Sequence, residues 1–95
     1  MNSAPLWKVS TSKHAQKHLA RAPRPERERL LRVLEEEMTR DPFAGDVVPL
    51  ANEQATFRRR VGNFRIFFDV DRTLQRVEIA DIKHRTTTTY RKKRS

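Results

Sequence analysis

A β-hairpin is encoded between Phe57 and Phe68, and it constrains the fold more than any other stretch of this chain. Two runs of strand-forming residues flank the pair Gly62-Asn63. Glycine suits a tight two-residue turn, because it adopts positive φ without steric cost. A turn at this pair sets Phe57 opposite Phe68. Side chains alternate between the two faces of a strand, so this register gives the hairpin one apolar face and one face crowded with arginine.

The two predicted faces of the hairpin differ sharply in charge. The apolar face carries Phe57, Val61, Phe64, Ile66, Phe68 and Val70, with Arg59 as its one misfit, and the other face carries Arg58, Arg60, Arg65 and Phe67. In this register Arg60 lies directly opposite Arg65. Like charges opposed across a sheet are destabilising, so folding alone does not call for the pair. A polyanionic partner does.

Composition points the same way. The chain has 95 residues, enough for one small domain with one core, and a formal net charge of +9 with a pI of about 11.1. Such a balance favours RNA, DNA, an acidic protein or a membrane surface as partner. The absence of cysteine excludes disulfides, thiolate zinc sites and cysteine nucleophiles. No apolar run approaches the roughly 20 residues of a membrane span, and residues 1–8 do not look like a signal peptide. We therefore expect a soluble, cytoplasmic protein with no membrane partner.

The remaining pattern predicts an α+β fold: two N-terminal helices on a mainly antiparallel sheet of about four strands, in the order β-α-α-β-β-β. Residues 1–95 are expected to form a single domain. The predicted elements are a strand at 6–10, a helix at about 13–21 capped by residues 10–12, a helix from about 25 to 40, a loop at 43–52, the hairpin and a strand at about 75–83. A basic tail follows from about 86, and its sequence is compatible with either a mobile arm or a short final helix.

Several motifs, in this order, resemble the RelE/ParE superfamily of bacterial toxins from toxin–antitoxin systems, and its RelE-like branch in particular. They are the opening Trp7-Lys8-Val9, the helical hairpin ending in Asp41-Pro42, the core Phe57-Arg58-x-Arg60-Val61-Gly62-x-Phe64-Arg65-Ile66, and finally His84-Arg85 and Tyr90. The resemblance covers nearly the whole chain. It implies a RelE-like fold and a ribosome-dependent endoribonuclease that cuts mRNA by attack of a ribose 2′-hydroxyl on the adjacent phosphate, with no metal or other cofactor.

The resemblance also assigns residues. Arg58, Arg65, Arg85 and Tyr90 match the family's basic and aromatic catalytic positions, and Arg60 matches a position that is commonly basic. Two residues depart from the pattern. Thr56 stands where some members have a further lysine, and Arg59 stands where an aliphatic residue is usual.

The proposed chemistry needs a proton acceptor, charge stabilisation on the phosphate, and a proton for the leaving oxygen. Guanidinium groups suit the second task, because they grip phosphate bidentately and stay charged. Arginine is a poor base, so His84 and Tyr90 are the candidates for proton transfer, and Tyr90 is also a candidate platform for base stacking. The residues do not decide between these roles. We further expect RNA contacts from Arg60, Lys83, Arg91 and Lys92.

Other functions fit the same residues. A ParE-like inhibitor of DNA gyrase shares the fold and lacks nuclease activity. A plain nucleic-acid-binding module, or an inactive relative kept for its antitoxin, is also compatible with the charge and with Thr56. His14 and His18 have a spacing that can bind a metal, but without a third ligand nearby in sequence we interpret them as solvent-facing and predict no metal site.

A toxin of this family implies partners. The resemblance implies a cognate antitoxin, which the charge of +9 predicts to be acidic, together with the ribosome and mRNA. Operator DNA is expected to bind only the toxin–antitoxin complex. Some of Leu19, Leu31 and Val47 are candidates for an apolar docking groove for the antitoxin.

Overall fold

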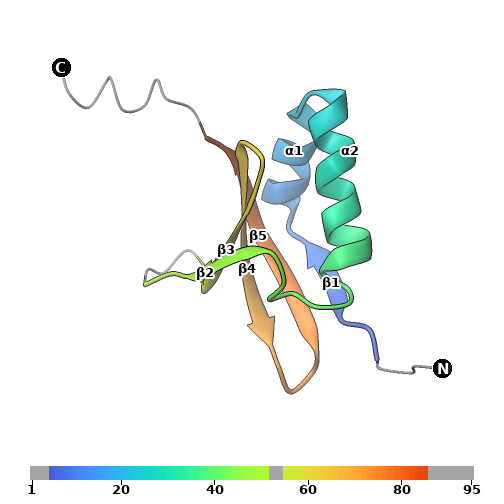
Figure 1. The fold of residues 1–95 in the computed structure, drawn as a ribbon, viewed down its shortest axis with the longest axis vertical. Helices are drawn as coiled ribbons and strands as arrows, with labels where there is room; N and C mark the ends of the chain where they lie inside the picture. Colours follow the sequence, from blue (N-terminus) through green and yellow to red (C-terminus); the bar gives the residue numbers. More distant parts are fainter. Residues whose placement is uncertain (1–4, 52–54, 86–95) are drawn as a thin grey trace.

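A computed structural model describes residues 5–51 and 55–85 of the chain. Within these residues two helices and a π-helical turn lie on one side of a five-stranded sheet (Figure 1). The elements are β1 (Lys8–Thr11), α1 (Lys13–Arg21), α2 (Arg24–Arg32), the π-helical η1 (Val33–Glu37), β2 (Asp46–Pro49), β3 (Phe57–Val61), β4 (Phe64–Asp71) and β5 (Arg76–His84). The expected α+β architecture is confirmed.

The strand order is β1-β5-β4-β3-β2, and β1 pairs parallel with β5 while the other pairs are antiparallel. The sheet has one strand more than expected. β2 pairs with β3 inside the segment predicted to be a loop. It is short and ends at Pro49, which cannot donate to a ladder and is therefore tolerated mainly at a sheet edge. Because β2 is short and contains proline, the sequence pattern did not predict it as a strand.

The predicted helix bounds hold at most ends. The Ser12 side chain caps α1 by accepting a hydrogen bond from the Ala15 N–H at 3.0 Å. Pro25 lies in the first turn of α2, where its missing N–H is no loss. The helical segment ends at Glu37 rather than near residue 40, and its last five residues are wound as a π-helix, with the Met38 N–H donating to the Val33 carbonyl.

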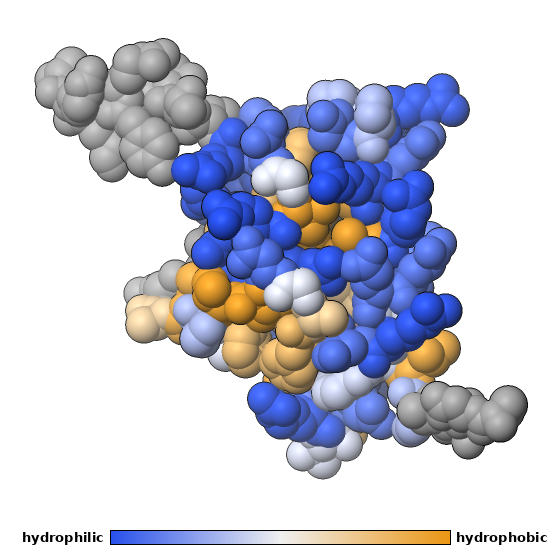
Figure 2. Space-filling model, in the orientation of Figure 1, coloured by the Kyte–Doolittle hydropathy of each residue, from blue (hydrophilic) through white to orange (hydrophobic). Residues whose placement is uncertain are grey.

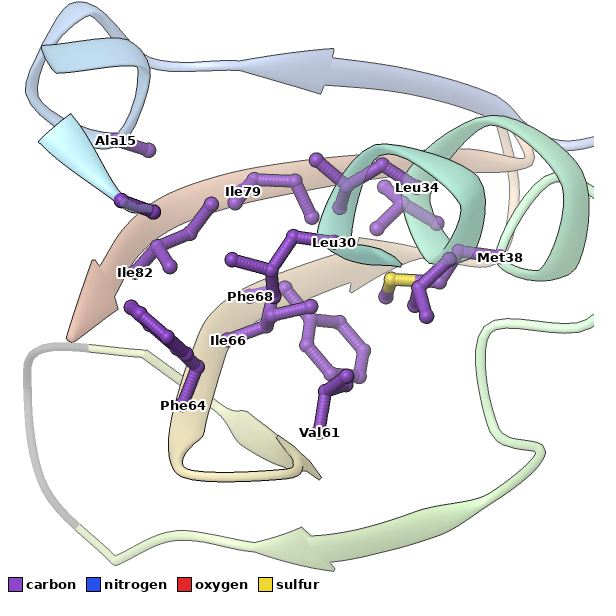
Figure 3. Packing of buried hydrophobic residues seen from close by; sticks show 13 residues of the cluster. Ala15, Leu30, Leu34, Met38, Val61, Phe64, Ile66, Phe68, Ile79 and Ile82 are labelled. Carbon is purple, nitrogen blue, oxygen red and sulfur yellow. The ribbon is translucent and has the colours of Figure 1, made fainter. Parts of the chain in front are cut away.

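The hairpin register is confirmed pair by pair, from Phe57 opposite Phe68 to Val61 opposite Phe64. Its apolar face packs beneath α2 and η1 (Figure 3). The buried cluster brings together Leu30, Leu34 and Met38 from the helical layer with Val61, Phe64, Ile66, Phe68, Val77, Ile79 and Ile82 from the sheet. The alternation read from the sequence therefore identifies the core face of the sheet.

Arg59 is the misfit on that core face, and the structure explains how it is held. Its side chain is 10% exposed and forms an ion pair with Glu37 at the end of η1. Its guanidinium lies over Gly45, where a Cβ atom would meet the Arg59 Cζ at 2.8 Å. Gly45 also has a φ of +85°, so both its backbone conformation and the lack of room for a Cβ atom favour glycine.

Candidate nucleic-acid interface

A row of charged residues crosses four strands on the sheet face opposite the helices. Asp46 of β2 pairs with Arg60, Arg60 pairs with Arg65, and Arg65 pairs with Lys83 of β5. Neighbouring strands lie about 4.8 Å apart, so Arg60, Arg65 and Lys83 start from backbone positions spanning about 10 Å. We call these three residues the cationic row. The expected opposition of Arg60 and Arg65 is present, and Lys83 extends it.

The members of the cationic row differ in how their charge is balanced. The Arg60 Nε donates to the Asp46 Oδ2 at 3.0 Å, and both of these side chains are close to half exposed. Arg65 and Lys83 form no salt bridge with any residue in 5–51 or 55–85. The unbalanced positive charge is therefore concentrated on Arg65 and Lys83, which makes them the natural contacts for an anion.

Phe67 lies on the same face of the sheet as Arg65, two residues along β4. It is opposite Arg58, its exposed fraction is 7%, and the Lys83 Nζ lies 5.4 Å from its ring centroid. At that distance the ammonium is attracted to the ring face. Phe67 is too buried to serve as a platform for an RNA base. Its ring instead contacts the Lys83 ammonium.

Arg85 lies one residue beyond β5, beside the hairpin turn. Its backbone N–H donates to the Asn63 carbonyl at 2.7 Å, which extends the ladder past the end of the strand. By alternation its side chain falls on the same face as Lys83. The structure thus gathers Arg58, Arg60, Arg65, Lys83 and Arg85 on one face and at one end of the sheet.

His84 does not share that face. It is opposite Phe64 on the helix side of the sheet, and the two rings contact edge to face with centroids 4.8 Å apart. Its side chain borders a hollow of about 570 Å³ lined by His18, Arg21, Ala22, Pro23, Phe64, Ile82, Lys83 and His84. Figure 2 shows hydrophobic atoms between hydrophilic side chains where the sheet meets the helices. A proton-transfer role for His84 remains a prediction, on a face other than that of Arg65.

A β-bulge in β5 places Lys83 and His84 on these opposite faces of the sheet. Phe67 pairs with Asp81 and Phe68 pairs with Ile79, so Ala80 is an extra residue in β5. Without the bulge, alternation from Ile79 would set Lys83 on the core face and His84 among the arginines. The extra residue exchanges them.

Three predicted site residues, Tyr90, Arg91 and Lys92, lie outside the described residues, as does the rest of the tail from residue 86. Their assignments remain predictions.

The open face also carries carboxylates that the sequence analysis did not single out. Besides Asp46, Asp69 accepts hydrogen bonds from the N–H and Oγ1 of Thr56 at 2.8 and 2.6 Å. Thr56, one of the two residues that depart from the expected pattern, therefore has a structural contact. Asp69 is four residues from Arg65 along β4, about 13 Å, which is too far for both to act on one phosphate. Period-two alternation along β4 was the signal that would have found it.

The structure corrects one interpretation of the histidines. His14 is largely exposed, with a side-chain exposed fraction of 65%, but His18 is only 32% exposed and its Nδ1 lies 2.7 Å from the Asp81 Oδ1. Asp81 is 63 residues away from His18 in sequence. Sequence spacing gave no signal for this contact.

The fold defined by these elements is that of RelE-like proteins. A chain of the toxin–antitoxin complex RelBE2 from Mycobacterium tuberculosis superposes with a TM-score of 0.75 at 24% identity, covering 86% of this chain and 100% of that chain. A chain of the archaeal RelE–RelB complex from Pyrococcus horikoshii OT3 superposes with a TM-score of 0.63 at 25% identity, covering 83% of this chain and 94% of that chain. The RelE-like resemblance is thereby confirmed.

No family model matches the sequence, and no curated protein matches it. Within the described residues, no helix combines the length and the apolar character needed to cross a membrane.

Proposed function

We propose that this protein is the toxin of a toxin–antitoxin pair and acts as a ribosome-dependent mRNA endoribonuclease that inhibits translation. The observation that carries the proposal is the cationic row. Arg60 and Arg65 are directly opposed, Lys83 follows, and no helix covers this face in the described residues. Like charges at opposed positions disfavour folding by a few tenths of a kcal/mol to about 1 kcal/mol, and the ion pair of Arg60 with Asp46 offsets only part of that penalty. Contact with a phosphate backbone offsets that penalty, and the RelE-like fold supports RNA as the source of the phosphates.

In the proposed reaction, the ribose 2′-hydroxyl attacks the adjacent phosphate and the 5′-oxygen of the next nucleotide leaves. We assign to Arg65 the stabilisation of charge on the non-bridging oxygens, because it is the central member of the cationic row and its guanidinium has no carboxylate partner among the described residues. Arg58 and Arg85 flank it as further donors. Lys83 and Arg60 hold the strand by its phosphates. Tyr90 is the leading candidate for proton transfer at this face, because His84 lies on the helix side of the sheet.

The proposed partners follow from the same charge. An acidic antitoxin would screen the cationic row and associate rapidly with a chain of net charge +9. Leu19 and Leu31, two of the predicted docking residues, line one hollow of about 470 Å³ between α1, α2 and β1. Val47 is in β2 and packs against the core elsewhere. We therefore assign the antitoxin groove to Leu19 and Leu31. Binding of operator DNA is proposed only for the toxin–antitoxin complex.

The test is an mRNA cleavage assay with purified protein, with and without programmed ribosomes. Because its substrate would be mRNA under translation, the proposed site of action is the cytoplasm. Arg65→Ala should reduce the single-turnover cleavage rate by about 100-fold or more, the usual effect of losing one donor to a developing oxyanion. Arg32→Ala is the matched control, because Arg32 is an exposed arginine of α2 in the helical layer. It should cleave at the wild-type rate. Equal losses from both variants would contradict a catalytic site.

The alternatives give different results in the same experiment. A ParE-like protein would leave mRNA intact under both conditions and would block supercoiling by DNA gyrase in a parallel reaction. A plain nucleic-acid-binding module would bind RNA without cutting it, and each basic residue would contribute comparably. An inactive relative would do neither and would still bind its antitoxin.

A further inference from the structure

His14, His18 and Asp81 form a cluster at the contact of α1 with β5 that the proposed reaction does not use. One nitrogen of each imidazole and one oxygen of the carboxylate lie within 4.8 Å of one another. The His14 Nε2 is 3.4 Å from the Asp81 Oδ2, and the His18 Nδ1 is 2.7 Å from the Asp81 Oδ1. Two helical residues four apart and one strand residue thus converge on a single point.

The backbone brings this cluster together at an edge of the sheet. β1 ends at Thr11, so the second half of β5 has a free edge, and α1 turns to lie along it (Figure 1). The Ser12 Oγ donates to the Ala80 carbonyl at 2.8 Å, which fixes the start of α1 at the bulge. Bulges commonly redirect a side chain. Here the residue after the bulge, Asp81, has its carboxylate against the helix face that carries both histidines.

Asp81 is the buried member, with a side-chain exposed fraction of 3%. Its Oδ1 accepts from the Ile82 N–H at 2.8 Å and contacts the His18 Nδ1. For its Oδ2, the nearest polar group found among the described residues is the His14 Nε2, at a distance longer than an ordinary hydrogen bond. A buried carboxylate is expected to be paired, hydrogen-bonded or bound to a metal. One of its two oxygens is therefore incompletely satisfied and directed toward an imidazole.

We propose that His14, His18 and Asp81 bind a zinc ion. Zinc takes imidazole nitrogens at about 2.0–2.1 Å and carboxylate oxygens at about 2.0–2.2 Å, in a tetrahedron whose ligand atoms are then about 3.3 Å apart. The separation of 3.4 Å between the His14 Nε2 and the Asp81 Oδ2 matches such an edge. The His18 Nδ1 lies 2.7 Å from the Asp81 Oδ1 and 3.1 Å from the Ile82 carbonyl, so these hydrogen bonds must open as the ion enters. Two imidazoles and one carboxylate are a known type of zinc ligand set, with the fourth position left to water. The exposure of His14 keeps that position open to solvent.

Bound zinc would clamp α1 to the free edge of β5. Contacts between these elements include the Ser12 hydrogen bonds to β5, the small buried Ala15 and the His18 hydrogen bonds. His18 also lines the 570 Å³ hollow beside Lys83 and His84, so the ion would fix one wall of that hollow. The site does not depend on the proposed nuclease activity, and its test needs no RNA.

The experiment uses the full chain without a polyhistidine tag. Zinc binding is measured by isothermal titration calorimetry, and Co²⁺ is the spectroscopic probe, because tetrahedral Co²⁺ absorbs visible light far more strongly than octahedral Co²⁺. We expect one zinc per chain with micromolar or tighter affinity, a tetrahedral Co²⁺ spectrum, and a rise in Tm of about 5 °C or more with saturating zinc.

Two variants at the exposed and buried ends of the cluster test the ligands. His14→Gln removes a ligand whose side chain is mostly in solvent, so the variant should fold normally. Its zinc affinity should fall by more than about 100-fold, because even residues that only hydrogen-bond to zinc ligands contribute about 10- to 100-fold. Asp81→Asn should do the same if it folds. His84→Gln is the matched control, since His84 is the third histidine of the chain and lies outside the cluster. It should bind zinc as the wild type does.

The proposal is overturned if the wild type shows no saturable zinc binding, if the Co²⁺ spectrum is octahedral, or if His14→Gln binds zinc as tightly as the wild type. In the first case the cluster would be a hydrogen-bonded group that holds α1 without metal. Loss of nuclease activity would not enter the outcome, so failure here is separate from failure of the proposed function.

Discussion

Removing the carboxylate of Glu37 should destabilise the protein, whereas replacing its partner Arg59 with methionine should not. The two residues form an ion pair between η1 and β3, and Arg59 is 10% exposed while Glu37 is 48% exposed. In the Glu37→Ala variant the guanidinium stays in the core without its partner. In the Arg59→Met variant the charge itself is gone, and the freed Glu37 carboxylate can be solvated. Opposite signs are therefore expected from the two halves of one interaction.

The magnitude follows from burial. Breaking a fully buried pair by removing one partner destabilises by about 3–5 kcal/mol, while exposed pairs contribute about 0–1 kcal/mol. Because Glu37 is half exposed, we expect a loss of about 2 kcal/mol for Glu37→Ala. At about 4–8 °C per kcal/mol for a domain of this size, the Tm should fall by about 10 °C.

Arg59→Met removes more than the pair. The Arg59 Nε and Nη1 are buried and have no hydrogen-bond partner among the described residues, and each such group opposes folding by about 1–3 kcal/mol. Methionine fills a similar length of apolar space. Replacing a buried ion pair by apolar groups is often neutral or stabilising by about 1–4 kcal/mol. We expect a change between zero and about 2 kcal/mol of added stability.

The assay is urea unfolding followed by circular dichroism, with both single variants and the double variant. The double variant should match Arg59→Met, which gives a coupling free energy of about 2 kcal/mol. Glu36→Ala is the control, because Glu36 is an exposed neighbour in η1, and it should change stability by less than about 0.5 kcal/mol. The reasoning is refuted if Arg59→Met loses about 2 kcal/mol or more while Glu37→Ala is neutral.

Three further predictions concern the frame of the fold. Gly62→Ala should destabilise the fold by about 1–2 kcal/mol in urea titrations, because Gly62 has a φ of +60°. Gly62→Asn should lose less stability, since asparagine tolerates that backbone region. Equal losses from the two variants would point to a clash with the nearby Arg29 side chain instead. Ser12→Ala should lose about 1–2 kcal/mol, because the hydroxyl both caps α1 and bonds β5, and Ser12→Thr should restore most of it. Phe68→Ala should lose about 3–5 kcal/mol by thermal unfolding, since Phe68 is fully buried, and a loss below about 1 kcal/mol would mean that the core differs from Figure 3.

The sequence by itself determined the hairpin, its register and the positions of both helices. These features rest on local rules: a glycine turn fixes the pairing of the residues on either side, and alternation fixes the face of each one. The opposition of Arg60 and Arg65 therefore follows from the order of the residues alone. So does the core face with Phe68, and the sequence placed the cap of α1 within residues 10–12, of which the structure selects Ser12.

Only the tertiary structure decided which residues of distant segments come into contact. The bulge at Ala80 moves Lys83 into the cationic row and His84 to the opposite face, because a shift of one residue exchanges the faces of every residue that follows. The contacts of Asp81 with His14 and His18, which lie far earlier in the chain, also depend on how α1 packs along β5. Periodicity within a segment does not encode where a neighbouring strand adds a residue, since that depends on how the whole sheet packs beneath its helices.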